Sequence, residues 1–438
     1  MHTISDQQVH SDSLYDICNK KRKNSILTAP VIATLMICIV AFTGGTSQAI
    51  NTVFIVISLL VALFAPKTFG YSLYAGTIVY LGYSYIQLTN YISDTLSSST
   101  YIHYLCLAVL INCVMRGDGI LKQIKAMNPV YFIFIAWFSL SRIPLSYLSA
   151  IGLFVQCFFL WKLINEVKDD SRIFRSFFYA LILALFSTYL YAAIWSELLS
   201  EDLKYGFCGA RDSNNFAYLC NLCIVLLQYD KEIKSKTKYI LTFLLVIGVL
   251  LTVSMSGFAS LMAIFIASKI FKKKRGIVTI WVYILFFTSI LILVFGNTVL
   301  STLATHSGII GNITSRLTNI FGALKVGDYQ SVTTNRTILW GYYIAQYQSM
   351  SFTQKLFGSQ LIVTGLQKSY YASHSSFVDL LVGCGVLGLL IFIIMYISNL
   401  VKNLKNGDIK LAAFSFIFLV NLAFRTFSGF SLLFPIML

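Results

Sequence analysis

The chain alternates between long apolar runs and short polar stretches. Each run is roughly long enough to cross a bilayer core of about 30 Å, and lipid offers the backbone no hydrogen-bond partners, so the runs are expected to be helices. The pattern therefore predicts an all-α polytopic membrane protein with about 13–14 transmembrane helices. The predicted spans are residues 26–43, 49–65, 70–89, 102–115, 128–141, 145–163, 174–195, 214–229, 239–253, 256–271, 277–295, 376–398 and 411–424, with a short final one over 427–438.

The first apolar run follows the basic block Lys20, Lys21, Arg22 and Lys23, as in a signal peptide. The polar stretch before it is long and contains acidic residues, and no small-residue cleavage site precedes the next run. We therefore expect an uncleaved first span with its N-terminus in the cytoplasm.

Composition agrees with this prediction. The 438 residues are 57% hydrophobic and 11% charged, with a mean hydropathy of +0.76. Soluble domains average about 45–50% apolar and about 25% charged residues. A soluble protein, a disordered chain and a small disulfide scaffold are thereby excluded.

The net charge of +16 has two explanations, nucleic-acid binding or the positive-inside rule. With the N-terminus inside, most of the 33 Lys and Arg residues fall on the cytoplasmic side, Lys67 and Lys162 among them, so no nucleic-acid partner is needed. Lys dominates the inner side, whereas Arg is prominent outside. The outer basic residues are Arg142, Lys204, Arg211, Arg316, Lys325, Arg336, Lys355, Lys368 and Arg425.

One long outer segment interrupts the series of spans. We predict a cytoplasmic tail over 1–25, a helix bundle over 26–295, a large periplasmic loop over 296–375, and C-terminal transmembrane helices over 376–438. Long ordered loops usually carry function. No internal repeat is evident, which disfavours an inverted-repeat transporter.

The outer Arg residues and one His are the candidate chemical groups. Arg grips phosphate bidentately. Arg211 and Arg336 lie in polar loops, whereas Arg142 and Arg425 sit at helix ends, where snorkelling to the headgroups is the alternative. His374 precedes an apolar helix; it is either a general base for a sugar hydroxyl or an ordinary polar residue at a helix start.

Metal and nucleotide chemistry are not indicated. The nine cysteines include a Cys220–Cys223 pair at CxxC spacing, but it lies on an apolar run without a second pair or a nearby His. The chain has no P-loop and no dinucleotide fingerprint. We expect no metal and no cofactor.

Four stretches together carry a resemblance. They are Gly-Ala-Arg-Asp-Ser-Asn-Asn-Phe-Ala over 209–217, Thr-Val-Ser-Met-Ser-Gly-Phe over 252–258, Thr-Asn-Arg-Thr-Ile-Leu-Trp-Gly over 334–341 followed by Leu-Phe-Gly over 356–358, and the His374 segment with Gly385 and Gly388. In order and spacing, over about residues 205–400, the set resembles the bacterial O-antigen polymerase and O-antigen ligase superfamily of membrane glycosyltransferases. Ser256-Gly257 stands where the family usually has Ser-Arg, so no role is carried to that turn. His374-Ser375 stands where His-Asn is common.

The resemblance implies a GT-C-like membrane glycosyltransferase in the bacterial inner membrane. It would use an undecaprenyl-diphosphate-linked oligosaccharide at the periplasmic face, without a metal, and hold the lipid tail among its helices. Arg211 and Arg336 would neutralise the developing charge on the diphosphate, with Arg142 or Arg316 assisting. His374 would deprotonate or orient the acceptor hydroxyl.

Four functions remain open at this point, the least favoured being a cell-shape peptidoglycan polymerase, a related enzyme. A polymerase, which we favour, would move the growing glycan onto the next lipid-linked repeat unit, and a chain-length regulator would be a partner. A ligase would move the finished glycan to the lipid A core. A lipid-linked oligosaccharide flippase would instead be expected to have ionisable residues deep in its spans, whereas those of this chain lie almost wholly at span ends.

Overall fold

In the part of the chain that it describes, the computed structural model is mainly helical, with short turns between the helices and no strand. It describes residues 28–39, 48–83, 98–119, 124–125, 127, 129–140, 147–194, 213–230, 233–252, 254–270, 318–319, 322–323, 326–328, 336–359, 373 and 375–423. Within these ranges every predicted span is a helix, with ends that differ by a few residues. The predicted spans 277–295 and 427–438 lie outside the described residues.

The helices match the apolar runs closely. A short helix covers Thr28–Ile39. The labelled helices are α2 (Gln48–Phe64), α3 (Lys67–Tyr83), α4 (Ser98–Met115), α6 (Pro129–Leu140), α7 (Tyr147–Asp169), α8 (Ser171–Ile194), α9 (Ser213–Tyr229), α10 (Ser235–Leu251), α11 (Met255–Ile270), α15 (Arg336–Ser349), α16 (Phe352–Phe357), α17 (Ser376–Lys405) and α18 (Ile409–Leu422). Among the described residues, three regions are long and apolar enough to cross a membrane: Ala150–Val167, Ser171–Thr188 and Ser376–Lys405.

The chain divides into two compact units. Unit 1 contains residues 1–120 and 165–191, and unit 2 contains residues 121–164 and 192–438. In unit 1, α2, α3 and α4 pack against one another. The α3 residue Ser72 joins α8 through a 2.8 Å hydrogen bond between its hydroxyl and that of Ser176. Buried serines paired in this way let apolar helices approach closely without leaving a polar group unsatisfied.

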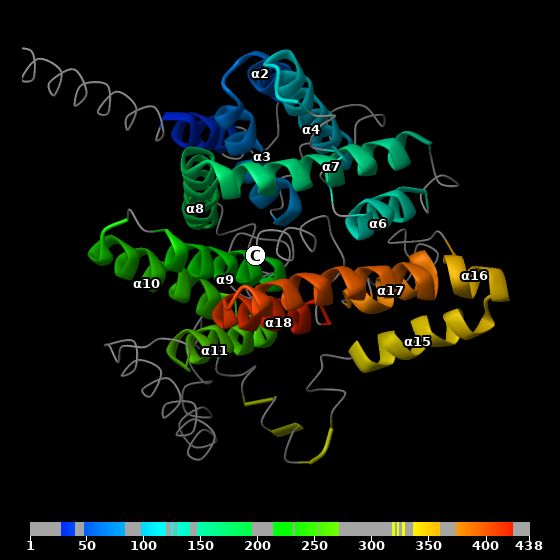
Figure 1. The fold of residues 1–438 in the computed structure, drawn as a ribbon. Coiled ribbons are helices and arrows are strands. Elements are labelled where there is room, and N and C mark those ends of the chain that lie inside the picture. The colour runs from blue at the N-terminus through cyan, green and yellow to red at the C-terminus, as the bar shows by residue number, and fades with distance from the viewer. Residues whose placement is uncertain are drawn as a thin grey trace, which may run out of the picture. The chain divides into compact units, whose positions relative to one another are not determined.

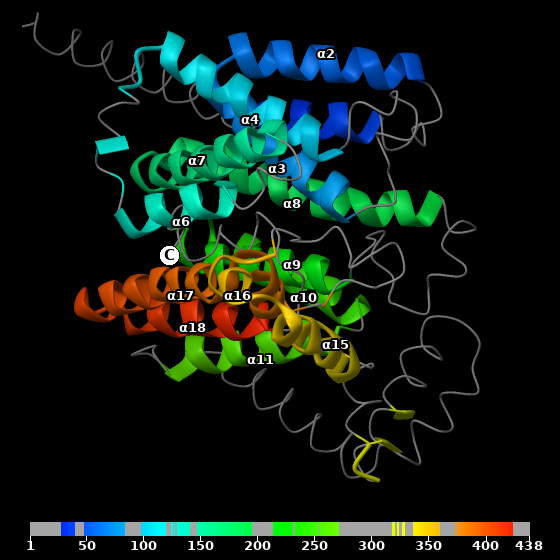
Figure 2. The ribbon, with the colours of Figure 1, turned by 90° about the vertical axis from the view of Figure 1, so that its right-hand side faces the viewer.

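Unit 2 is organised around α17. This helix packs against α6, α15, α16 and α18, and a second set of contacts runs from α18 to α11, from α11 to α9 and from α9 to α10. Figures 1 and 2 both show α17 and α18 side by side. The core is aromatic: the Phe134 and Phe392 rings lie 5.5 Å apart, and Phe392 is 5.0 Å from Tyr396.

Apolar side chains also cover the outside of the helices. On α17 the exposed residues recur every three or four positions, which forms one continuous stripe, and α2 carries a similar set. Water would solvate such stripes poorly, whereas lipid would cover them at no cost. The α17 stripe is Leu390, Ile394, Ile397, Val401 and Leu404. The fold is thus compatible with a membrane protein.

Three details differ from the sequence expectations. Helix α7 continues to Asp169 rather than ending near 163, so Lys162 lies inside the helix and is only 1% exposed, not at a solvated span end. Helix α17 runs to Lys405 and has a non-helical break at Gly385. The segment expected as a loop over 296–375 contains α15 and α16. Hydropathy registers apolar length but not such breaks or amphipathic helices.

Candidate functional site

The structure describes one of the five predicted site residues. Arg336 is the first residue of α15 and is partly exposed. Arg142, Arg211, Arg316 and His374 lie outside the described residues. The described residues that flank these four in the chain show which of their segments meet.

Helix α15 is anchored beside the His374 segment. Trp340 lies one turn after Arg336, and its indole Nε1 donates a 2.9 Å hydrogen bond to the carbonyl oxygen of Ser373. Residues four apart share a helix face, so the face that begins at Arg336 includes this contact. Ser373 immediately precedes His374 in the chain. The third and fourth stretches of the sequence resemblance therefore meet here.

The start of α17 is held by a buried polar cluster. The Ser373 hydroxyl donates to Asp379 Oδ1 at 2.6 Å, and the backbone N–H of Ser375 donates to the Ser373 hydroxyl at 3.0 Å. The Ser375 side chain caps α17 by accepting from the Val378 N–H. Ser373, Ser375 and Asp379 are all buried. The residues on both sides of His374 are thus tied to the first turn of α17.

Asp379 is a site residue that the sequence reasoning did not single out. It is 6% exposed, and its carboxylate accepts a hydrogen bond from Ser373, the residue before His374 in the chain. The signal was present in the sequence, because this carboxylate interrupts an apolar run five residues after His374. Buried carboxylates are costly unless hydrogen-bonded, so the serine contact explains how it is tolerated.

Tyr343 brings α15 against the same turn of α17. It packs with Met350 and Val382 in a small buried cluster. Burial and the negative charge of Asp379 raise the pKa of Tyr343 above its ordinary value. Its hydroxyl is therefore protonated throughout the physiological range, and α15 presents a neutral side chain to this carboxylate.

Two glycines allow α16 to touch the backbone of α17. Gly358, which follows α16, has φ +93°, and Gly385, at the break in α17, has φ +71°. A Cβ on Gly385 would lie 2.6 Å from the Gly358 nitrogen and would collide with the Leu356 carbonyl. The Ser359 N–H donates to the Val382 carbonyl at 2.8 Å. Only glycine combines this φ with so close an approach.

Trp137, on α6, contacts the same junction. Its Nε1 donates a 3.1 Å hydrogen bond to the carbonyl oxygen of Cys384, next to the break in α17. Its ring stacks on Phe357, with 5.3 Å between the ring centroids. The carbonyl beside the break therefore has a donor. This contact fixes the α16–α17 junction from a third helix.

The first and second stretches of the resemblance also meet. Asn214, near the start of α9 and three residues after Arg211 in the chain, accepts a 2.7 Å hydrogen bond from Ser254 in the α10–α11 turn. Asn221 on α9 donates to the Gly257 carbonyl at 2.9 Å. A Cβ on Gly257 would collide with the Ala217 side chain, so the glycine allows α11 to pack closely against α9.

Unit 1 contains a separate ionic network. Lys67 lies 3.1 Å from Asp118 and 3.2 Å from Glu166, and Tyr71 donates to Glu166 at 2.7 Å. Ligand atoms of Cys113, Asp118 and Glu166 lie within 4.8 Å of one another, the only such group among the described residues. These atoms could hold a cation, but the Lys67 ammonium already supplies the positive charge between the two carboxylates. We therefore interpret the network as structural.

These observations define an all-helical chain, in its described part, with apolar helices suited to a membrane and two polar junctions formed by the four stretches. Comparisons with protein families, with curated proteins and with solved structures found no match.

Proposed function

We propose that the chain is a bacterial O-antigen polymerase. It transfers the growing glycan from undecaprenyl diphosphate onto an incoming lipid-linked repeat unit, at the periplasmic face of the inner membrane. The proposal includes a GT-C-like fold of about 13–14 helices with a cytoplasmic N-terminus. A chain-length regulator protein is its expected partner.

One observation carries the proposal. The Trp340–Ser373 hydrogen bond ties the helix that begins at Arg336 to the residue before His374. A cation for a diphosphate and a base for a hydroxyl must act within one site, so their two segments must meet. Arg336 and His374 are separated by 38 positions in the chain, and Trp340 and Ser373 by 33, within a segment that hydropathy alone predicted as a loop.

The chemistry needs few groups, because the donor is already activated. A bond forms between the acceptor hydroxyl oxygen and the anomeric carbon, and the bond from that carbon to the diphosphate breaks. His374 takes the hydroxyl proton. Arg211 and Arg336, assisted by Arg142 or Arg316, neutralise the charge that develops on the leaving undecaprenyl diphosphate. Asp379 positions the His374 segment through Ser373.

The test replaces the proposed groups one at a time in a strain that depends on this gene. Arg211→Ala, Arg336→Ala and His374→Ala should each abolish long-chain polysaccharide on a lipopolysaccharide gel while the protein still inserts. Arg336→Lys should restore activity only in part, because it keeps the charge but loses the bidentate fork. Lys355→Ala, which changes another outer basic residue, is the matched control and should leave chain length unchanged.

The deletion strain distinguishes the alternatives. Loss of a polymerase leaves one repeat unit on the lipid A core, whereas loss of a ligase leaves none. Purified protein that elongates glycan in detergent, without a vesicle, would exclude a flippase. Wild-type chain lengths in all three alanine variants would overturn the site assignment.

A further inference from the structure

A pocket in unit 2 lies away from the proposed catalytic segment. It encloses about 280 Å³ between the C-terminal halves of α9 and α11 and the N-terminal parts of α10 and α18. The four helix ends that meet here border the stretches 231–238, 269–275 and 402–410, which the charge pattern predicts to be cytoplasmic. The His374 segment, by contrast, is predicted to be periplasmic.

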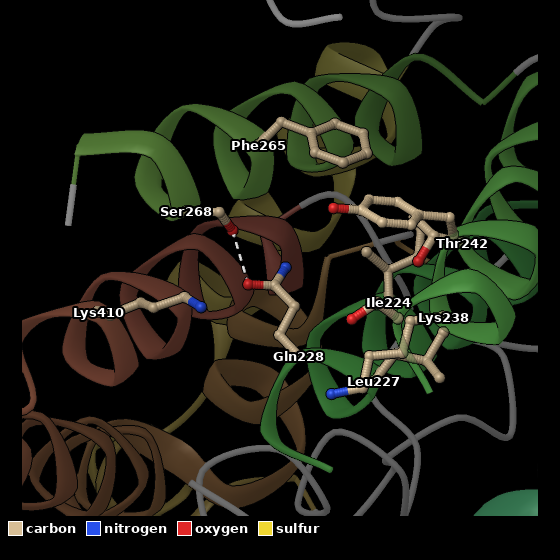
Figure 3. Close-up of a pocket in the computed structure, with 10 residues that line it drawn as sticks. Ile224, Leu227, Gln228, Lys238, Thr242, Phe265, Ser268 and Lys410 are labelled. Atoms are coloured by element: carbon tan, nitrogen blue, oxygen red, sulfur yellow. Dashed lines mark hydrogen bonds between the residues drawn. The ribbon is translucent and has the colours of Figure 1, made fainter. Parts of the chain in front are cut away.

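The pocket lining combines positive charge, hydrogen-bonding groups and an apolar wall. Figure 3 shows Gln228 between Lys410, on α18, and the α10 residues Lys238 and Thr242. Ile224, Leu227 and Phe265 form apolar parts of the lining. Two ammonium groups with hydroxyls and an amide suit a phosphate, and the adjoining apolar side chains suit an acyl chain.

The polar groups are held in place by neighbouring contacts. Lys410 lies over the rings of Tyr229 and Phe414, with 5.3 and 5.4 Å from its Nζ to the ring centroids. Lys238 donates to the Asp230 carbonyl oxygen. Ser268 donates to Gln228 Oε1 at 3.0 Å, which orients the amide across the pocket. The lining is thus arranged before a ligand arrives, which lowers the entropic cost of binding.

Each of the two nearest carboxylates along the chain accepts one hydrogen bond from a backbone N–H. Asp230 Oδ1 accepts from the Ile233 N–H at 3.2 Å, and Asp408 Oδ1 accepts from the Leu411 N–H at 2.9 Å. Lysines dominate the surroundings. Those described in this part of unit 2 are Lys234, Lys236, Lys238, Lys269, Lys402, Lys405 and Lys410.

We propose that this pocket binds the headgroup of an anionic phospholipid from the cytoplasmic leaflet. The lipid phosphate lies between Lys238 and Lys410, and the start of an acyl chain lies against Leu227 and Phe265. A bound lipid would join α9, α10, α11 and α18; of these, α9 and the turn between α10 and α11 also form the Asn214–Ser254 junction. The site is independent of the glycan chemistry, and its test needs no transferase activity.

The test measures lipid binding by purified full-length protein in neutral detergent, using native mass spectrometry and thermal melting. The probes are phosphatidylglycerol, phosphatidylethanolamine and inorganic phosphate. Phosphatidylglycerol should stay bound and raise the melting temperature, whereas the zwitterionic lipid and phosphate should not. The Lys238→Gln/Lys410→Gln variant should bind phosphatidylglycerol roughly tenfold or more weakly, because each lysine contributes to the attraction.

Two further variants keep the result interpretable. Lys402→Gln/Lys405→Gln removes the same charge from exposed positions outside the pocket and should bind as the wild type does. Lys238→Arg/Lys410→Arg keeps the charge and should retain binding. Equal binding by the Lys238→Gln/Lys410→Gln and Lys402→Gln/Lys405→Gln variants would overturn the proposal. Equal stabilisation by inorganic phosphate would also overturn it, since the ligand would then be a free anion.

Discussion

Unit 1 and the α15–α17 region of unit 2 both bury polar groups among apolar helices, but they satisfy them differently. In unit 1, Lys67 lies between Asp118 and Glu166, so opposite charges compensate one another. In the α15–α17 region, serine hydroxyls, an indole and backbone groups meet around one carboxylate, Asp379. In unit 1 the charged groups pair with one another, which is typical of a structural network. In the α15–α17 region the contacts hold two distant chain segments together, which is what a catalytic site requires.

The two networks are also expected to differ in what their loss changes, stability in one case and activity in the other. Breaking the unit 1 network should cost stability and leave chemistry intact. Breaking the α15–α17 junction should cost activity more than stability, because its contacts set where the Arg336 and His374 segments lie.

Gly385→Ala should have the largest effect. The residue has φ +71° and ψ −179°, a backbone region that is essentially restricted to glycine and costs another residue about 1–3 kcal/mol, and the added Cβ would collide with the Leu356 carbonyl. We expect about 3 kcal/mol of destabilisation in total and loss of long-chain polysaccharide. Thermal melting in detergent and a lipopolysaccharide gel measure the two.

Substitutions at two other glycines separate the cost of backbone strain from the cost of a steric collision. Gly407→Ala has a similar φ, +75°, but no atom within 4 Å of the new Cβ, and Gly341→Ala places its Cβ in open space on α15. The first should cost about 1 kcal/mol, whereas the second should stabilise α15 by up to about 1 kcal/mol, because alanine has the higher helix propensity. A Gly385→Ala protein that melts no lower than Gly407→Ala would show that the α16–α17 backbone contact is unimportant.

Lys67→Met should have the second largest effect, a loss of stability. It leaves Asp118 and Glu166 facing each other without a cation. Removing one partner of a fully buried pair costs about 3–5 kcal/mol, but the Lys67 side chain is 29% exposed, so we expect about 2 kcal/mol. Melting measures this cost. Lys67→Met/Glu166→Gln should recover part of it, and glycan length at matched protein levels should be unchanged.

A change in glycan length in Lys67→Met, at equal protein level, would contradict the structural role given to the unit 1 network. The unit 1 network would then act on the chemistry and not only on stability.

Trp340→Phe should have a smaller effect on stability. It removes the donor to the Ser373 carbonyl, at a cost of about 1 kcal/mol. Since this bond holds the Arg336 helix to the His374 segment, glycan chains should shorten clearly. Ile344→Val, at an exposed position of the same helix, is the control for altered packing. Equal chain lengths in both variants would remove the main support for the proposed site.

Asp170→Asn should have the smallest effect. Hydrogen bonds from Arg172 hold the pKa of Asp170 below its ordinary value. The pair therefore adds stability at pH values above the unfolded carboxyl pKa of about 3.9, and this is lost as pH falls through the folded pKa. Both groups are partly exposed, so the effect is slight. Melting curves of variant and wild type should differ near pH 7 and converge below about pH 3.

Much of the fold followed from hydropathy alone. The positions of α2, α9 and α18 match predicted apolar runs to within a few residues, because a helix lets an apolar segment satisfy its own backbone hydrogen bonds. The signals for α15 and α16 were weaker, since their residues are more polar than those of a span. Neither the α17 break nor the burial of Lys162 has a hydropathy signature.

The sequence by itself determined the helical, apolar character of this protein and the chemical types of its candidate groups, Arg336 and His374 among them. Only the tertiary structure decided which distant stretches meet: Trp340 with Ser373, Gly358 with Gly385, and Asn214 with Ser254. The reason is physical. Local hydropathy depends on neighbours along the chain, whereas a hydrogen bond across 33 or 40 positions depends on how the helices pack.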